Sequence, residues 1–227
     1  MMSADSPDRQ VKYSGNVFGT RVTSFQFRHL NCLPFITPNQ NEKLNYMSIN
    51  IVAFSGSLRK KSYTTRLTKV FQQLAPADVS MQIADISQLP LINEDLEGNF
   101  PQPVKELHNT IQQADAILLA TPEYNRSYSP VLKNALDWGS RPEGKNKWKG
   151  KPVAIIGCTP YALGAFGAQN HLRQVVMYLD MYPLQQPEFY LGSVNDKIND
   201  FGELTDDTTR KKITELWTAF LGLIKNK

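Results

Sequence analysis

The stretch IVAFSGSLRKKSYTTRL, residues 51–67, decides the fold of this chain. It begins as a continuous apolar run, turns at Ser55-Gly56-Ser57, and passes through a basic, hydroxyl-rich turn into a helical pattern. An apolar strand that leads through a short turn into a helix is typical of the repeating unit of a parallel α/β sheet. The same unit should therefore recur further along the chain.

Apolar strand-like runs and amphipathic helical patterns alternate along the chain. Strands are predicted at 49–54, 79–85, 116–121, 152–158 and 183–192. Helices are predicted at 62–75, 103–114, 130–139, 167–180 and 205–225. This alternation predicts an α/β fold with a doubly wound, five-stranded parallel sheet. In the common strand order 2-1-3-4-5, ligands bind beyond the carboxyl ends of the first and third strands, which places residues 55–64 and 121–129 at the predicted site.

The composition indicates one globular domain with an N-terminal extension. The chain has 227 residues, of which 41% are hydrophobic and 20% are charged. Residues 1–46 are polar and show no sustained period, so we predict a flexible extension or an upstream start before Met47. An organellar transit peptide is the alternative. Residues 47–227 form the predicted domain.

The charge and the cysteines of the chain limit which partners and which cellular compartment are expected. The net charge of +4 comes from scattered charges, which favours a solvated surface over a nucleic-acid interface. No apolar stretch approaches the roughly 18 residues of a membrane-spanning helix, so no membrane partner is expected. Cys32 and Cys158 lie far apart and match no metal-binding spacing. We therefore expect a reducing, cytoplasmic setting and no metal site.

The first loop offers groups that bind phosphate. Its hydroxyl side chains are Ser55, Ser57, Ser62, Thr64 and Thr65. Arg59 adds a planar guanidinium, and the following helix adds free N–H groups and the positive end of its dipole. The loop lacks the second glycine of a P-loop, and Gly56 alone does not make a dinucleotide loop, which favours a single phosphate over NAD or FAD. A capped helix behind a solvated basic turn is the structural alternative.

The second loop, TPEYNRSYSPVLKNALDW at residues 121–138, can border a flat heterocycle. Tyr124 and Tyr128 provide aromatic faces, and Asn125 tolerates unusual turn dihedrals. Glu123 could serve acid–base chemistry, but we interpret it as an exposed loop carboxylate.

A third loop, CTPYALGAFGA, occupies residues 158–168. Gly164 and Gly167 allow the backbone to come close to a ligand. We interpret Cys158 as a small buried hydrophobe, because no histidine lies near it in sequence.

The motifs GSLRKKSYTTRL and TPEYNRSYSPVLKNALDW resemble the NADPH-dependent FMN reductase family, and in particular its chromate and quinone reductases. HLRQVVMYLD and PEFYLG extend the similarity, which covers about residues 48–225. The resemblance implies a flavodoxin-like fold, non-covalently bound FMN, and NADPH or NADH as co-substrate. It also implies a homodimer or homotetramer, in which Arg173 and Glu188 lie at a subunit interface or remain solvated surface charges.

By position, the resemblance implies a set of residues that bind FMN. They are Ser57, Arg59, Ser62, Tyr63 and Thr64 at the phosphate and its tail, Pro122, Glu123, Tyr124 and Asn125 along the isoalloxazine, and Thr159 near its pyrimidine edge. The family often has Asn at the position of Thr64, whose hydroxyl can still donate to phosphate. Pro160 removes a backbone donor from the third loop.

The implied reaction is a ping-pong cycle in which NAD(P)H gives hydride to the flavin N5 and a small acceptor then receives the electrons. Quinones, azo compounds, chromate and free flavin all suit an open flavin face, and no catalytic side chain is expected. Two rival functions stay open, a flavodoxin-type electron carrier and a flavin-bound sensor without NADPH turnover. Carriers of that kind are usually acidic, whereas this chain has a pI near 9.0.

Overall fold

A parallel sheet in the order β2-β1-β3-β4-β5 forms the centre of the fold, and β6 also pairs with β4. The computed structural model describes residues 48–227, so the predictions for residues 1–46 lie outside the described residues. The strands are β1 (Ile49–Ser55), β2 (Val79–Ala84), β3 (Ala116–Thr121), β4 (Pro152–Cys158), β5 (Tyr182–Pro183) and β6 (Phe189–Leu191). The predicted α/β class and strand order 2-1-3-4-5 are confirmed.

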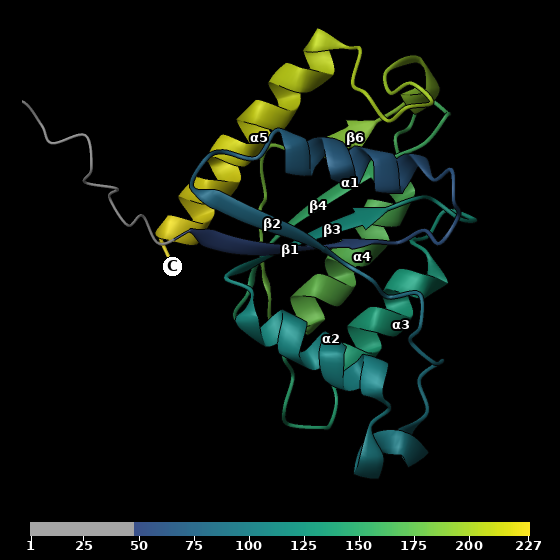
Figure 1. Ribbon diagram of the computed structural model, residues 1–227, viewed down its shortest axis with the longest axis vertical. Helices are drawn as coiled ribbons and strands as arrows, with labels where there is room; N and C mark the ends of the chain where they lie inside the picture. The colour runs from purple at the N-terminus through teal and green to yellow at the C-terminus, as the bar shows by residue number, and fades with distance from the viewer. Residues whose placement is uncertain (1–47) are drawn as a thin grey trace, which may run out of the picture. The chain divides into compact units, whose positions relative to one another are not determined.

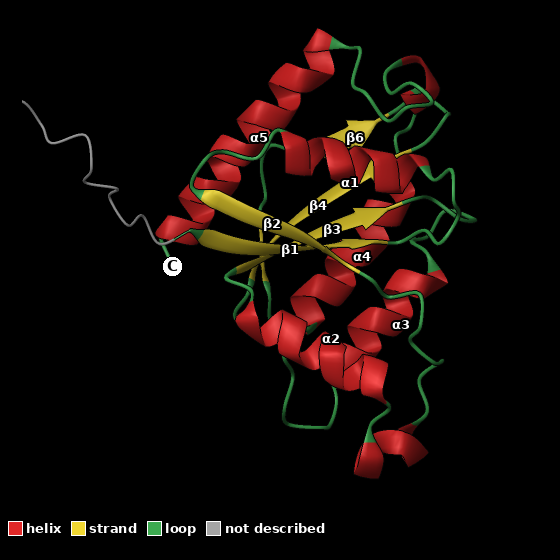
Figure 2. Ribbon diagram, viewed as in Figure 1, coloured by secondary structure: helices red, strands yellow, loops and turns green. Residues whose placement is uncertain are grey.

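Five α-helices cover both faces of this sheet in residues 48–227. They are α1 (Tyr63–Gln73), α2 (Gln102–Gln113), α3 (Pro130–Gly139), α4 (Phe166–Tyr178) and α5 (Asp207–Lys225), with short 3-10 turns at η1 (Glu94–Asn99) and η2 (Val194–Asp196). Helices α1 and α5 lie on one face, and α2, α3 and α4 lie on the other (Figures 1 and 2). None of these helices is long and apolar enough to span a membrane.

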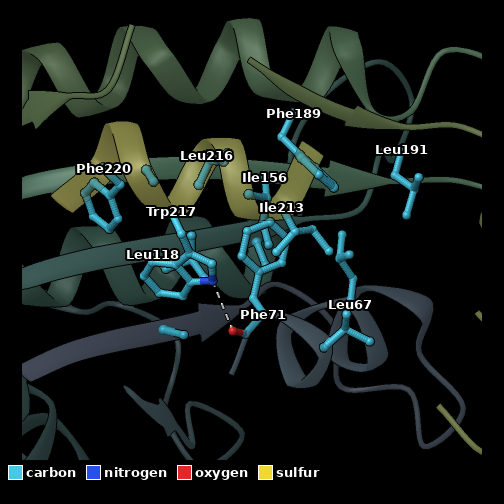
Figure 3. Close-up of a cluster of buried hydrophobic side chains, with 14 of the residues drawn as sticks. Leu67, Phe71, Leu118, Ile156, Phe189, Leu191, Ile213, Leu216, Trp217 and Phe220 are labelled. Carbon is cyan, nitrogen blue, oxygen red and sulfur yellow. Dashed lines mark hydrogen bonds between the residues drawn. The ribbon is translucent and has the colours of Figure 1, made fainter. Parts of the chain in front are cut away.

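Two apolar cores follow from the period-two alternation of side chains along the strands. In β1, Ile51 and Ala53 point into the core beneath α1 and α5, whereas Val52 and Phe54 point into the core beneath α2, α3 and α4. Figure 3 shows the first of these cores, where the Trp217 indole N–H donates to the Phe71 carbonyl at 3.2 Å. Burial of each such large side chain stabilises the fold by about 1.5–3 kcal/mol.

Side-chain caps set where three of the helices begin. Ser62 Oγ accepts the Thr65 N–H at 3.1 Å, and Ser129 Oγ accepts the Leu132 N–H at 3.2 Å. The Asp206 carboxylate accepts the Thr209 N–H at 2.7 Å. Each cap satisfies a backbone donor that has no partner within its own helix. For this reason α1 and α5 begin just after Ser62 and Asp206, slightly later than the predicted helices.

The predicted strand at 183–192 is divided in the structure. Its two pieces, β5 and β6, both pair with β4, and the residues between them leave the sheet. Proline has no backbone N–H and therefore interrupts a ladder of hydrogen bonds. Pro183 ends β5, and Pro187 lies in the gap between the two pieces. The sheet thus has a minor sixth strand in place of one longer fifth strand.

Candidate flavin site

Three loops meet beyond the carboxyl ends of β1, β3 and β4. The N–H of Gly56, directly after β1, donates to the Ala120 carbonyl in β3 at 2.8 Å, which ties the first two loops together. A cavity of about 310 Å³ lies between the loops. It is lined by Ser57, Arg59, Ser62, Tyr63, Thr64, Pro122, Glu123, Tyr124, Cys158, Thr159, Pro160 and Tyr161. All the predicted site residues except Asn125 therefore line this one cavity.

The first loop presents backbone donors to the cavity. Tyr63 and Thr64 occupy the first turn of α1, where N–H groups have no partner within the helix. Hydrogen bonds that fix this turn run from the Thr65 N–H to Ser62 Oγ at 3.1 Å and between the hydroxyls of Thr65 and Ser55 at 2.9 Å. The first turn of α1 carries no acidic residue. Its positive dipole end is therefore open to an anion such as a phosphate.

Arg59 borders the same cavity and is held by its neighbours. One of its terminal nitrogens donates to the Lys61 carbonyl at 3.0 Å, and its guanidinium carbon lies 5.6 Å from the centre of the Tyr63 ring. Arg66 approaches the same ring at 5.4 Å and pairs with Asp200 at 3.2 Å. Two arginine side chains therefore lie at one tyrosine beside the start of α1, and Arg59, which has no carboxylate partner within residues 48–227, adds positive potential to the phosphate site.

The second loop makes a tight reversal directly after β3. Tyr124 and Ser127 exchange two backbone hydrogen bonds, at 2.8 and 2.9 Å. Between them, Asn125 and Arg126 have φ values of 50° and 67°, the pair of left-handed residues that a type I′ turn requires. Asn125 therefore adopts the unusual turn dihedral that the sequence indicated. Arg126 adopts one as well, although a long side chain rarely does so.

Glu123 is not the exposed loop carboxylate that the sequence suggested. Its side chain is only 11% exposed, and its two oxygens have different partners. Oε2 accepts the N–H of Ala168 at 3.2 Å, in the first turn of α4, while Oε1 pairs with Arg126 at 3.1 Å. Ala165, at the N-terminal end of α4, offers no side-chain cap. Glu123 caps α4 from another loop and so joins the second loop to the third.

The third loop borders a second cavity of about 480 Å³ that adjoins the first. Its lining is Glu123, Asn125, Arg126, Thr159, Tyr161, Leu163 and Ala165. Asn125 lines this cavity and not the first, whereas the predicted residues Glu123 and Thr159 line both cavities. The Thr159 hydroxyl donates to the Tyr161 carbonyl at 2.9 Å, and its N–H donates to the Leu191 carbonyl at 3.1 Å. Thr159 thus stabilises the conformation of the loop, and its hydroxyl oxygen can still accept a hydrogen bond from a ligand.

Cys158 lies at the floor of the first cavity, at the end of β4. Burial raises the pKa of its thiol to about 12, although a contact with the Thr64 hydroxyl opposes the shift. The sulfur lies 4.0 Å from Thr64 Oγ1. A thiol with this pKa stays protonated near neutral pH and is a poor nucleophile. The interpretation of Cys158 as a small buried hydrophobe agrees with its position.

Several lining residues carried no signal strong enough to single them out. They are Arg126 and the apolar residues Tyr161, Leu163 and Ala165 of the third loop. From the third loop, the sequence analysis expected close approach of the backbone and, through the resemblance, a contact of Thr159 with the ligand. Its position after β4, the strand beside β3, could have identified its side chains as lining residues.

The residues present fit FMN. The start of α1, the hydroxyls of the first loop and Arg59 all line the first cavity, and they are groups that a phosphate requires. Pro122 and Tyr124 of the second loop line the same cavity and offer surfaces against which a flat ring can lie. Within residues 48–227, Glu123 is the only carboxylate of the lining, and it interacts with Arg126 and with the start of α4. The fold and these loops together define a flavodoxin-like flavin-binding protein.

Comparison with known proteins identifies the family within that class. The profile described as NADPH-dependent FMN reductase matches residues 49–196. A quinone reductase of Pseudomonas putida is 43% identical over 160 residues, which cover 70% of this chain and 86% of that protein. A 2-hydroxy-1,4-benzoquinone reductase of a Burkholderia species is 40% identical over 181 residues, or 80% of this chain and 99% of that protein. The chain belongs to the NADPH-dependent FMN reductase family.

A solved structure supports the same assignment. The flavoenzyme FerB of Paracoccus denitrificans, an NAD(P)H:(acceptor) oxidoreductase, superposes with a TM-score of 0.74 at 38% identity. The match covers 78% of this chain and 97% of that chain. The flavodoxin-like fold, the enzyme class of NAD(P)H-dependent reductase, and FMN with NAD(P)H as cofactors are confirmed by these findings.

Proposed function

We propose that this protein reduces quinones with electrons from NAD(P)H. The observation that supports the proposal is the pair of adjoining cavities at the carboxyl ends of β1, β3 and β4. One carries phosphate-binding groups, and the other is lined in part by Tyr161, Leu163 and Ala165. Relatives from a bacterium and a plant carry the names quinone reductase and NADPH:quinone oxidoreductase. Azo compounds, chromate and free flavin are further acceptors that an open site of this kind would admit.

The chain would hold FMN through its first two loops. Ser57, Arg59, Ser62 and Thr64 would bind the phosphate and its tail together with the N–H groups at the start of α1, and residues 122–125 would line the ring. FMN, when bound, supplies the hydride chemistry that no side chain can perform. Glu123 is occupied as a cap and Cys158 stays protonated, so neither residue is needed as an acid, base or nucleophile.

A ping-pong order follows if both substrates use the same opening in turn. The second cavity is shared with the first through Glu123, Thr159 and Tyr161, so a nicotinamide and a quinone would compete for one position beside the ring. Departure of the oxidised nucleotide would then precede binding of the acceptor. Parallel double-reciprocal plots for NADPH and benzoquinone are the expected kinetic result.

Anaerobic titration of the FMN-reconstituted protein with NADPH tests the proposed function. We expect the flavin absorption band to bleach within the mixing time and to return when one equivalent of 1,4-benzoquinone is added. Bound flavin that bleaches slowly or not at all would contradict a reductase and favour an electron carrier or a sensor. Failure to retain any FMN would contradict the assignment of both loops.

We also propose that the protein is a homodimer or homotetramer in the cytoplasm. Met177 and Tyr178 at the end of α4 are 63% and 89% exposed, and adjoining apolar side chains of this kind offer a surface that a second copy could cover. Arg173 and Glu188 form an ion pair at 3.4 Å, and the buried Arg173 Nε has no hydrogen-bond partner among residues 48–227. Light scattering after size exclusion measures the assembly, and a monomer at micromolar concentration would contradict it.

A further inference from the structure

Among the residues that the structure describes, Arg126 is the only cationic side chain that lines the second cavity. It lies at the tip of the second loop with φ at 67°, in the left-handed region that a long side chain rarely adopts. The flanking hydrogen bonds between Tyr124 and Ser127 hold this conformation, so the side chain leaves the loop in a defined direction. Backbone held in such a region is often found where a functional side chain must be aimed.

Most of the hydrogen-bonding capacity of Arg126 remains available. Its side chain is 73% exposed, and a single terminal nitrogen pairs with Glu123 at 3.1 Å. An arginine has five N–H donors in a planar fork that matches a carboxylate, phosphate or oxyanion in two-point contact. The contact with Glu123 therefore leaves donors that can face a ligand.

Glu123 does not cancel the positive charge of Arg126 at this site. Its second oxygen accepts the Ala168 N–H at 3.2 Å, so the carboxylate is also stabilised by the N-terminal end of the α4 dipole. The rest of the lining is neutral, namely Asn125, Thr159, Tyr161, Leu163 and Ala165. The dipole takes up part of the negative charge, which leaves excess positive potential at the cavity mouth. The side chains of Tyr161, Leu163 and Ala165, together with the positive charge of Arg126, suit a flat ring that carries a negative charge.

We propose that Arg126 recognises an anionic group on one of the two substrates and so sets which substrates the enzyme prefers. This inference rests on the proposed reductase function. The group has two possible sources with the same chemistry, the ring oxyanion of an ionised hydroxyquinone and the 2′-phosphate of NADPH. Arg126 is a specificity residue that contacts substrate charge and takes no part in hydride transfer.

The test measures two discrimination ratios in the FMN-loaded protein. The first is kcat/KM for 2-hydroxy-1,4-benzoquinone, which is ionised near neutral pH, divided by kcat/KM for neutral 1,4-benzoquinone. The second is kcat/KM for NADPH divided by that for NADH. Both ratios are measured for the wild type, Arg126→Gln and Arg126→Lys, with FMN content and melting temperature recorded for each. Arg210→Gln is the matched control, because Arg210 lies on α5 and lines neither cavity.

We expect Arg126→Gln to lower one ratio about tenfold, because a charge-assisted contact is lost from one substrate of the pair. Arg126→Lys should recover part of the loss, and salt should lower the wild-type ratio more than the variant ratio. Loss in the first ratio identifies the acceptor as the anion, and loss in the second identifies the nucleotide phosphate. If both ratios stay within twofold of the wild type, the inference is overturned. A wild type that does not reduce 1,4-benzoquinone would instead overturn the proposed function.

Discussion

The first loop lies so close to the start of α3 that a β-carbon on Gly56 would stand 2.6 Å from Ser129 Oγ. The same atom would lie 3.1 Å from Pro122 Cδ, at the start of the second loop. Ser129 is fully buried and caps α3 through the Leu132 N–H, so it has little freedom to move. The two loops that build the flavin site can approach one another only because residue 56 has no side chain.

Gly56→Ala should therefore destabilise the protein by about 1–3 kcal/mol and weaken FMN binding, because either Ser129 or the first loop must shift. Denaturant unfolding of the apoprotein measures the free energy, and quenching of FMN fluorescence measures the affinity. Gly222→Ala is the matched control, since a β-carbon there meets nothing within 4 Å in α5. That variant should be stabilised by about 0.5–1 kcal/mol. Equal stability of the two variants would contradict the proposed crowding at Gly56.

Removal of the Glu123 carboxylate should destabilise the second and third loops together. Glu123→Ala leaves the Ala168 N–H without its acceptor and Arg126 without its partner, at a cost of about 1–2 kcal/mol in the free energy of unfolding. Glu123→Gln should recover part of this loss, because its amide oxygen can still accept. The surface variant Glu215→Ala is the control, since Glu215 contacts Lys211 only at 4.0 Å on α5 and should change stability by less than about 0.5 kcal/mol. An equal effect of both alanine variants would show that Glu123 is no cap.

The Thr64 hydroxyl provides a direct test of the phosphate site. Thr64 is 2% exposed and lines the first cavity. Thr64→Val keeps the shape of the side chain and removes the donor, so the dissociation constant of FMN should rise about tenfold. Thr218→Val on the outer face of α5 is the control, because its hydroxyl donates only within the helix, to Thr214 at 3.0 Å. An unchanged FMN affinity in Thr64→Val would remove Thr64 from the proposed cofactor ligands.

Burial should make Cys158 unreactive until the protein unfolds. Its pKa of about 12 leaves roughly one thiolate in 10⁴ at pH 8, against about one in ten for a thiol with the ordinary value of 9.0. In a Cys32→Ser background, the disulfide reagent DTNB should react at least about 100-fold more slowly with the folded apoprotein than with the urea-unfolded chain. Similar rates in both states would contradict the burial of this thiol.

The same shift predicts how stability depends on pH. The folded state keeps the Cys158 proton up to a higher pH than the unfolded state does, so this contribution is constant below about pH 9 and is lost as pH rises from 9 toward 12. Cys158→Ala should flatten the decline in the free energy of unfolding between pH 9 and 10.5. If the substitution leaves the decline unchanged, groups other than Cys158 cause it.

The elements of the fold could be predicted wherever local sequence and tertiary context agree. The strands at 116–121 and 152–158 and the helix at 130–139 have the predicted bounds, because their runs are apolar throughout or are delimited by proline and glycine. The predicted strand at 183–192 was wrong in its continuity, because two prolines cannot complete the ladder with β4. Its residues have strand propensity, but pairing with a neighbour decides whether they join the sheet.

The cavity could be predicted in outline and not in its contacts. Hydroxyls after β1 and the turn after β3 were recognisable because the carboxyl ends of parallel strands meet at one edge. The partners of Glu123 and the side chains of the third loop were not, since Ala168 lies 45 residues away and carries no signal in its side chain. Any residue except proline can donate a backbone N–H, so the type of residue at position 168 does not reveal this hydrogen bond.

The sequence by itself determined the α/β class and the two loops that carry phosphate-binding and aromatic groups, because these depend on periodicity and on local turn chemistry. The strand order 2-1-3-4-5 was expected as a common order for this class, and the pairing of the strands confirms it. The tertiary structure alone decided that Glu123 caps α4, that Gly56 must lack a side chain and that Arg126 lines a cavity together with Tyr161, Leu163 and Ala165. Those properties depend on distances between atoms that are far apart in the chain, and such distances are set only when the strands pair and the helices pack.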